Sequence, residues 1–221
     1  MKALRFLLII VCTLSLTGCA STKQADSDSS LGKAQQTLDS LYQHYSAKDS
    51  YLLRESYPFD EQHKVTYLAS EDQANMPNQF SYLWPYSGTF SAVNALLEAT
   101  HDKKYQQLLD KRVLPGLEEY FDIQRTPNAY SSYIQTAPTS DRFYDDNVWL
   151  GIDFTDIYQI TQEKRYLDKA QLIWKFIESG TDSLLGGGIY WCEQKKESKN
   201  TCSNAPGSVL ALKLFKATND S

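Results

Sequence analysis

The apolar residues of this chain follow a helical spacing from Leu31 onward, and no segment shows the convincing alternation of a β-strand. The first apolar stripe consists of Leu31, Ala34, Leu38, Leu41, Tyr42 and Tyr45. A second helix is predicted after Trp84-Pro85, where proline suits a first helical turn. A third helix, between Tyr105 and Phe121, should kink or stop at Pro115, because proline lacks the N–H that a helix interior needs. The pattern predicts an all-α domain.

Two later helices have opposite characters. The first begins near Tyr144 and leaves no wide polar face, so it should be buried on most sides. Its apolar residues are Val148, Trp149, Leu150, Ile152, Phe154, Ile157 and Ile160. The second carries a single apolar stripe and should lie on the outside of the domain. That stripe consists of Tyr166, Ala170, Ile173, Trp174 and Ile177.

The chain also repeats itself with a period of about sixty residues. Three apolar helices end in similar turns, at residues 96–105, 157–166 and 214–221, with Thr followed two positions later by an acidic residue. An apolar helix, this turn and an amphipathic helix form each unit, which predicts inner and outer helices alternating around a closed α/α toroid. The third copy stops before its outer helix, so we expect residues 31–221 to form about the first half of a toroid. The alternative is chance similarity among helix ends.

The first residues have the layout of an exported lipoprotein. Lys2 and Arg5 precede an apolar run from Phe6 to Leu16, and Leu16-Thr17-Gly18-Cys19 is typical of a lipobox. The run is short for a transmembrane span, which favours cleavage over the alternative of an uncleaved anchor. The sequence therefore predicts export followed by lipid attachment.

Processing at this site would divide the N-terminal region into two parts. We expect residues 1–18 to be a signal peptide, Cys19 to carry the lipid, and residues 19–30 to form a flexible tether to the domain. Ala20 stands where the inner-membrane retention signal of Gram-negative lipoproteins has Asp, so the segment resembles that of an outer-membrane lipoprotein. The periplasmic and cell-surface faces both remain open.

Charge and cysteine content restrict the partners of the mature chain. The formal net charge is −5 and becomes more negative without residues 1–18, which disfavours nucleic acid as a partner.

After processing, Cys192 and Cys202 would be the remaining pair in an oxidising compartment, and we expect them to form a disulfide. The alternative is a zinc site, but two thiols without a nearby His or second Cys pair fall short of a ligand set. We expect no metal and no cofactor.

If the inner helices run parallel, the segments before them gather at one end of the toroid. These segments contain aromatic rings, amides and paired carboxylates, which suit a carbohydrate site because rings stack on sugar faces and amides bind hydroxyl groups. The candidate residues are Tyr82, Trp84 and Tyr86, then Tyr144, Asp145, Asp146 and Asn147, then residues 186–204 with Trp191 and Asn200. An acidic pair at a helix start can also serve merely as a cap.

Three motifs closely resemble family 76 of the glycoside hydrolases, the endo-α-1,6-mannanases. They are Leu83-Trp84-Pro85-Tyr86-Ser87, Tyr144-Asp145-Asp146-Asn147-Val148-Trp149-Leu150-Gly151, and Gly186-Gly187-Gly188-Ile189-Tyr190-Trp191 followed by Lys199-Asn200. The resemblance implies an (α/α)6 barrel that hydrolyses the α-1,6-mannan backbone with retention of configuration. It implies Asp145 as the nucleophile and Asp146 as the general acid/base, with Trp84, Tyr86, Trp191 and Asn200 lining the cleft. The expected partners are α-mannan or manno-oligosaccharides.

Elementary chemistry is compatible with these roles. Neighbouring side chains on a first helical turn can place carboxyl groups at the ~5 Å separation of retaining glycosidases. Crowding two acids also separates their pKa values, so one can be ionised while the other keeps a proton. The alternatives are a non-catalytic glycan-binding surface lipoprotein, an unsaturated glucuronyl hydrolase, a sugar epimerase and a transglycosidase. The sequence does not define the oligomeric state.

Overall fold

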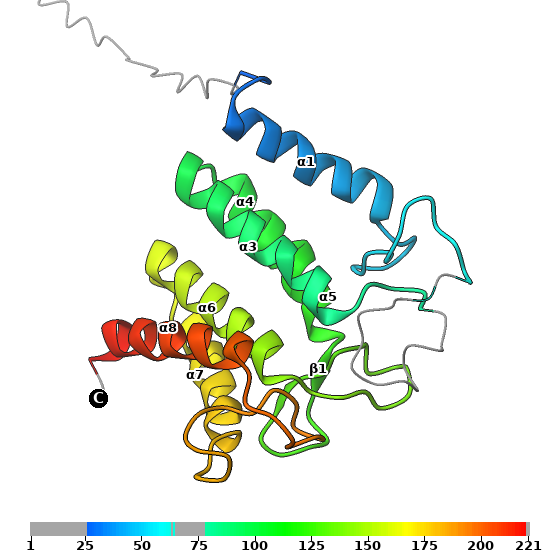
Figure 1. Cartoon of the computed structure of the whole chain (residues 1–221). Coiled ribbons are helices and arrows are strands. Elements are labelled where there is room, and N and C mark those ends of the chain that lie inside the picture. Colours follow the sequence, from blue (N-terminus) through cyan, green and yellow to red (C-terminus); the bar gives the residue numbers. More distant parts are fainter. Residues whose placement is uncertain (1–25, 63, 65–77, 220–221) are drawn as a thin grey trace, which may run out of the picture.

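The computed structural model describes residues 26–62, 64 and 78–219, and these residues are mainly helical (Figure 1). The helices are α1 (Ser30–Tyr45), α3 (Leu83–Thr100), α4 (Lys103–Leu108), the π-helical turn η1 (Leu109–Val113), α5 (Leu114–Glu118), α6 (Tyr144–Thr161), α7 (Lys164–Ser179) and α8 (Thr201–Thr218). Strands β1 (Phe121–Asp122) and β2 (Ala129–Tyr130) form a short antiparallel pair. The predicted all-α class is confirmed.

The predicted signal peptide, Cys19 and residues 19–25 of the predicted tether lie outside the described residues. Within residues 26–62, 64 and 78–219, none of the helices combines the length and the apolar character that crossing a bilayer requires. In the described part of the predicted tether, the Ser29 hydroxyl accepts a hydrogen bond from the Gly32 N–H at 3.0 Å and so caps α1.

Helices α1, α3, α6 and α8 follow one another across the molecule in chain order (Figure 1). Helix α6 lies between α3 and α8 and contacts both, while α7 packs against α6 and also reaches α8. A Cβ at Gly151 of α6 would lie 2.6 Å from a methyl group of Leu210, so α6 and α8 approach closely where this glycine stands. This arrangement confirms alternating inner helices (α3, α6, α8) and outer helices.

The burial of α6 and α7 follows their sequence patterns. Helix α6 is buried along most of its length, and Ile157 and Val148 have no exposed surface. Helix α7 buries one stripe, with Ala170 and Ile173 at 0% exposure, and presents charged residues on its other face. Before Pro115 the third predicted helix widens into η1, which confirms the expected interruption at that proline.

The sixty-residue repeat is confirmed by the ends of the three inner helices. Each ends in a residue with left-handed backbone geometry, whose N–H donates to a carbonyl four residues earlier. These residues are His101, Gln162 and Asn219, with φ of 54°, 61° and 56°. In each copy a threonine hydroxyl one residue earlier donates to the carbonyl of the preceding turn. These threonines are Thr100, Thr161 and Thr218.

The inner helices run in the same direction, and the segments before them meet at one end of the molecule (Figure 1). The first N–H of α3, from Leu83, donates to the Ser132 carbonyl in the segment before α6 at 2.9 Å. The first N–H of α6, from Tyr144, donates to the Trp191 carbonyl in the segment before α8, also at 2.9 Å. Helices α3 and α6 are therefore each tied at their start to the loop that precedes the next inner helix.

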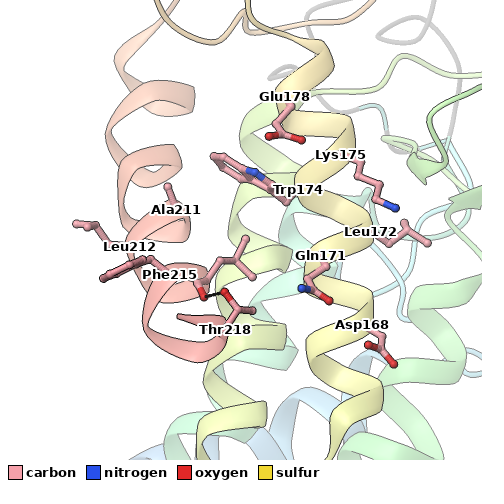
Figure 2. A pocket seen from close by; sticks show the side chains of 11 residues that line it. Asp168, Gln171, Leu172, Trp174, Lys175, Glu178, Ala211, Leu212, Phe215 and Thr218 are labelled. Atoms are coloured by element: carbon pink, nitrogen blue, oxygen red, sulfur yellow. Dashed lines mark hydrogen bonds between the residues drawn. The ribbon is translucent and has the colours of Figure 1, made fainter. Parts of the chain in front are cut away.

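Helices α7 and α8 leave an apolar groove of about 970 Å³ between them (Figure 2). Trp174 extends from α7, and Leu212 and Phe215 of α8 are 62% and 49% exposed. The other apolar residues of the groove are Leu172, Ala211 and Leu214. This groove lies on the side of the molecule where the helix series ends.

Candidate active site

The predicted aspartates lie in the first turn of α6, at the end of the molecule where the loops meet. The N-cap residue of α6 is Phe143, and its side chain makes no cap hydrogen bond. The backbone N–H groups of Asp145 and Asp146 lie near enough to the Asp145 carboxylate to favour its ionised form. Part of the capping role therefore falls to Asp145, although the surroundings of the pair go beyond what a cap requires.

Asp145 is half-buried and has side-chain partners from two other segments. The indole N–H of Trp191 donates to its Oδ2 atom at 3.1 Å, and the Cys202 thiol at the start of α8 donates to the same carboxylate. Its Oδ1 atom is buried and has no hydrogen-bond partner among the described residues. A buried carboxylate oxygen without a partner is unusual in a purely structural role and is more typical of a functional site.

The two aspartates differ in their protonation. Burial raises the pKa of Asp145 above its ordinary value, while hydrogen bonds from Cys202 and Trp191 oppose that shift by favouring the ionised form. Burial and the negative charge of Asp145 together hold the pKa of Asp146 well above its usual range. Asp145 therefore ionises first, and Asp146 keeps its proton to higher pH.

Three tryptophans accompany the pair. Trp84, the second residue of α3, is 59% exposed, and Trp191 is half-buried with its ring 5.1 Å from that of Phe143. Trp149, which the sequence pattern assigns to a buried face, is 47% exposed and lies one helical turn after Asp145. The sequence analysis missed Trp149 as a site residue. Its spacing of four positions from Asp145 was the available signal, because such residues share a helix face.

Three of the predicted substrate-binding residues are instead structural. Tyr86 is 1% exposed and donates its hydroxyl to the Val113 carbonyl at 3.0 Å. Tyr144 is 1% exposed and stacks on Phe176 with 4.6 Å between the ring centroids. Both side chains point into the packing between inner and outer helices, so the prediction that they contact substrate is wrong for this conformation.

Asn147 is the third of these corrections. It has no exposed surface, and its side chain bonds both the N–H and the carbonyl of Tyr130 at 2.9 Å. Asn204 does the same for Ile189 from the corresponding place in α8, at 2.7 and 2.8 Å. Each amide is the fourth residue of its helix and fixes the extended segment that precedes it. Sequence reasoning missed Asn204, whose signal was its position in the repeat.

Asn200 and the cysteines complete the predicted set. Asn200 is the half-buried N-cap residue of α8, two residues before Cys202, and so lies at the expected end of that helix. Cys192 and Cys202 are both free thiols, so the predicted disulfide is not formed. The buried Cys192 donates to Gln194 Oε1 at 3.9 Å, whereas Cys202 is exposed and bonds Asp145. The two thiols therefore have different neighbours in the structure.

Parallel inner helices, an outer helical layer and a carboxylate pair where the inner helices begin define the class of α/α-toroid proteins. A family model described as glycosyl hydrolase family 76 matches residues 56–221, and the chain belongs to that family. No curated protein sequence matches the chain significantly.

Solved structures show the same relationship. A family 76 mannosidase from Bacteroides thetaiotaomicron is 30% identical, with a TM-score of 0.70 over 86% of this chain and 49% of its own. The α-1,6-mannanase GH76A from Salegentibacter sp. HEL1_6 is 24% identical, with a TM-score of 0.62 over 86% of this chain and 46% of its own. An inactive variant of the Salegentibacter enzyme, with two adjacent aspartates replaced by asparagine, was solved in complex with α-1,6-mannotriose. This variant is 23% identical to the chain, with a TM-score of 0.61 over 86% of this chain and 46% of its own. The chain thus spans about half the length of these relatives.

Proposed function

We propose that this chain carries the catalytic carboxylates of a retaining endo-α-1,6-mannanase. The observation that carries the proposal is the asymmetry of Asp145 and Asp146. Both carboxyls at this helix start have a raised pKa, but burial and the charge of Asp145 hold the pKa of Asp146 well above its usual range, so Asp145 ionises while Asp146 keeps its proton. A retaining glycosidase needs this division between a nucleophile and a general acid.

In the proposed reaction Asp145 attacks the anomeric carbon of a mannosyl unit while Asp146 gives its proton to the departing glycosidic oxygen. This forms a covalent glycosyl–Asp145 ester and leaves Asp146 ionised. Asp146 then takes a proton from water, the resulting hydroxyl attacks the anomeric carbon, and the ester bond breaks. The Trp191 N–H on Oδ2 orients the Asp145 carboxylate for both steps.

Neutral sugar units suit the groups around this pair. The exposed faces of Trp84 and Trp149 can stack on sugar rings, a contact that needs no charged ligand. Mannan as the substrate class is supported by the mannotriose complex of the Salegentibacter variant. Because the chain spans about half of its relatives, the activity is proposed for a completed toroid, whether a longer chain or a second copy completes it.

The carboxylate roles can be tested with Asp145→Asn and Asp146→Asn. We expect each variant to lose more than about 100-fold in mannan hydrolysis, because positioned proton transfer and nucleophilic attack each contribute at least this much. Asp146→Asn should keep more activity on an aryl mannoside whose leaving group needs no proton. Proton NMR should detect the α-anomer as the first product of the parent.

Asp156→Asn is the matched control, since Asp156 lies on α6 but pairs with Lys213 away from the site. It should hydrolyse mannan like the parent. An initial β-anomer, or asparagine variants that remain active, would contradict the mechanism. Mannan binding without release of reducing ends would favour a non-catalytic glycan-binding protein instead.

We also propose that the protein is exported and held at the outer membrane by lipid on Cys19, because the lipobox ends at this residue. Cys19→Ser should give a longer, unprocessed precursor that incorporates no radiolabelled palmitate. Normal labelling of this variant would contradict the assignment. Cys202→Ser serves as the control, and it should be processed and labelled like the parent.

A further inference from the structure

A short antiparallel strip leads into the catalytic helix. Residues 142–144 lie beside residues 191–193, and Phe143 and Cys192 form a β-bridge at the centre. Backbone hydrogen bonds hold the strip on both sides of this bridge, from Tyr144 to Trp191 at 2.9 Å and from Glu193 to Arg142 at 3.0 Å. The strip therefore sets the register between the start of α6 and the segment that carries the Trp191 indole.

One end of the strip is closed by a charged pair. Arg142 has no exposed surface, and its guanidinium donates to both carboxylate oxygens of Glu193, from Nε to Oε2 at 2.7 Å and from Nη2 to Oε1. Its Nη1 atom donates to the Pro127 carbonyl at 2.9 Å, and its charge lies 4.9 Å from the centre of the Phe176 ring. A bidentate pair of this kind fixes geometry as well as adding energy.

The other end of the strip is the active site. Trp191 follows Tyr190 into the strip, its backbone N–H donates to the Ser198 carbonyl at 3.1 Å, and its indole N–H reaches Asp145. Side chains alternate between the two faces of an extended strand, so a slip of one residue would turn Trp191 away from Asp145. The two side-chain contacts are thus coupled through six backbone positions.

We propose that Arg142 and Glu193 form a positioning pair that holds the Trp191 indole on the Asp145 carboxylate. The inference rests on the proposed function for its consequence in catalysis, and on the geometry of the strip for the coupling itself. Neither residue touches the reacting atoms. Loss of Glu193 leaves the buried Arg142 guanidinium with only Asp122 as an ionic partner, at 3.7 Å. It also removes the bidentate side-chain contact that joins the two sides of the strip, which leaves the Gln194 side chain on the Arg142 N–H as the remaining polar side-chain contact across it.

The coupling can be measured without turnover. The full chain has four tryptophans, so a proton–nitrogen NMR spectrum contains four indole signals, and Trp191→Phe identifies the one of interest. In the parent this signal should move with pH as Asp145 ionises, and Asp145→Asn should abolish the movement. Glu193→Gln should also abolish it, because the indole no longer reaches the carboxylate.

Asp110→Asn is the matched control for a general loss of stability. Asp110 accepts hydrogen bonds from Tyr166 at 2.7 Å and from Arg165 at 2.8 Å, and joins η1 to α7 on the outer layer. This variant should melt at lower temperature yet keep the pH-dependent indole signal. If Glu193→Gln keeps the signal as well, the positioning role is refuted. Arg142→Lys retains the positive charge but cannot make the bidentate contact with Glu193. It should also abolish the pH-dependent movement of the indole signal, and it replaces Glu193→Gln in the test if that variant does not fold.

The catalytic consequence is read separately. In the completed enzyme, Glu193→Gln should lower kcat up to about 100-fold with little change in KM, since misplacement of a catalytic group by about 1 Å has this effect. The acid limb of the pH profile should move to higher pH, because Asp145 loses a donor that favours its ionised form. An unmoved limb would contradict the positioning role. If no variant of Asp145 affects mannan, the proposed function fails while the NMR result still decides the coupling.

Discussion

A third carboxyl on α6 lies largely away from water, as Asp145 and Asp146 do, but has different surroundings. Asp153 is 5% exposed and its Oδ2 atom accepts a hydrogen bond from the Ser91 hydroxyl at 2.8 Å. Its pKa is raised to about 7, mainly by burial. The charge of Asp156 adds to this rise, whereas the hydrogen bond from Ser91 and the charge of Lys213 oppose it. Unlike Asp145 and Asp146, Asp153 connects α6 to α3, because its backbone carbonyl also accepts a hydrogen bond from Asn94 at 2.9 Å.

This pKa makes folding stability depend on pH. The unfolded carboxyl ionises near pH 4, so between about pH 4 and 7 the folded state binds the extra proton and the free energy of unfolding falls as pH rises. Asp153→Asn removes the group, and we expect it to raise the melting temperature at pH 8 while leaving it nearly unchanged at pH 4. The full effect is of order a few kcal/mol. Thermal melts at both pH values check this, and a variant less stable than the parent at pH 8 would contradict it.

At the scale of single residues, the sequence located the acidic pair and two partly exposed tryptophans, whereas other predicted residues of the site are buried. Asp145, Asp146, Trp84 and Trp191 could be located because adjacent acids and exposed tryptophans are uncommon at a helix start. Tyr144 flanks the same pair, but its side chain points into the core. A sequence does not show on which side of a helix start a given aromatic ring falls, since that depends on the exact residue where the helix begins.

At the scale of elements, the two equivalent asparagines explain how inner helices hold the loops beside them. Asn147 satisfies the N–H and carbonyl of the buried Tyr130, and also donates to the Phe143 carbonyl at 2.9 Å. Asn204 makes the same three kinds of contact from α8. The strand pair β1–β2 is too short to be stable by itself. The Asn147 amide supplies the hydrogen bonds that a further strand would otherwise make to Tyr130.

We expect Asn147→Ala to lower the free energy of unfolding by about 3 kcal/mol or more, since each buried backbone group left without a partner costs about 1–3 kcal/mol. Urea denaturation followed by circular dichroism measures this. Asn204→Ala should have a smaller effect because Asn204 is half-buried and water can replace it in part. Equal and small losses in both variants would show that the bridging hydrogen bonds contribute little.

Helix order, the inner and outer layers and the repeat were all predictable, because each leaves a periodic trace of apolar positions. The strand pair was not, since two residues per strand are too few for an alternating pattern. The exact form of the interruption at Pro115 was also unpredictable. A proline signals a lost hydrogen bond, but whether the helix bends, stops or widens into a π-helical turn depends on the tertiary contacts of that segment.

At the scale of the whole molecule, the groove between α7 and α8 exposes apolar side chains on the surface of the described residues. Trp174 and the exposed Leu212 and Phe215 present apolar area where two neighbouring helices diverge (Figure 2). Exposed patches of this kind bind apolar molecules from water. The purified 221-residue chain should therefore bind a hydrophobic dye at this groove.

The double variant Leu212→Gln, Phe215→Gln should lose most of the dye fluorescence and keep the melting temperature of the parent, because both side chains are already in contact with solvent. Leu210→Gln on the same helix is the control. Leu210 has no exposed surface, so this variant should melt at lower temperature and bind more dye. Unchanged dye binding in the double variant would place the apolar surface elsewhere.

The repeat also has a consequence for how new specificities can arise. The second residue of each inner helix is Trp84, Asp145 or Cys202, and all three are at least partly exposed at the same end of the molecule. The hydrogen bonds that tie the inner helices to their loops are made by other residues, among them Leu83, Tyr144 and Asn204, so a replacement at one of these positions leaves those bonds in place. An aromatic ring, an acid and a thiol already occupy three copies of one backbone position. Evolution can therefore rewrite the chemistry of this surface one residue at a time without inventing a new fold.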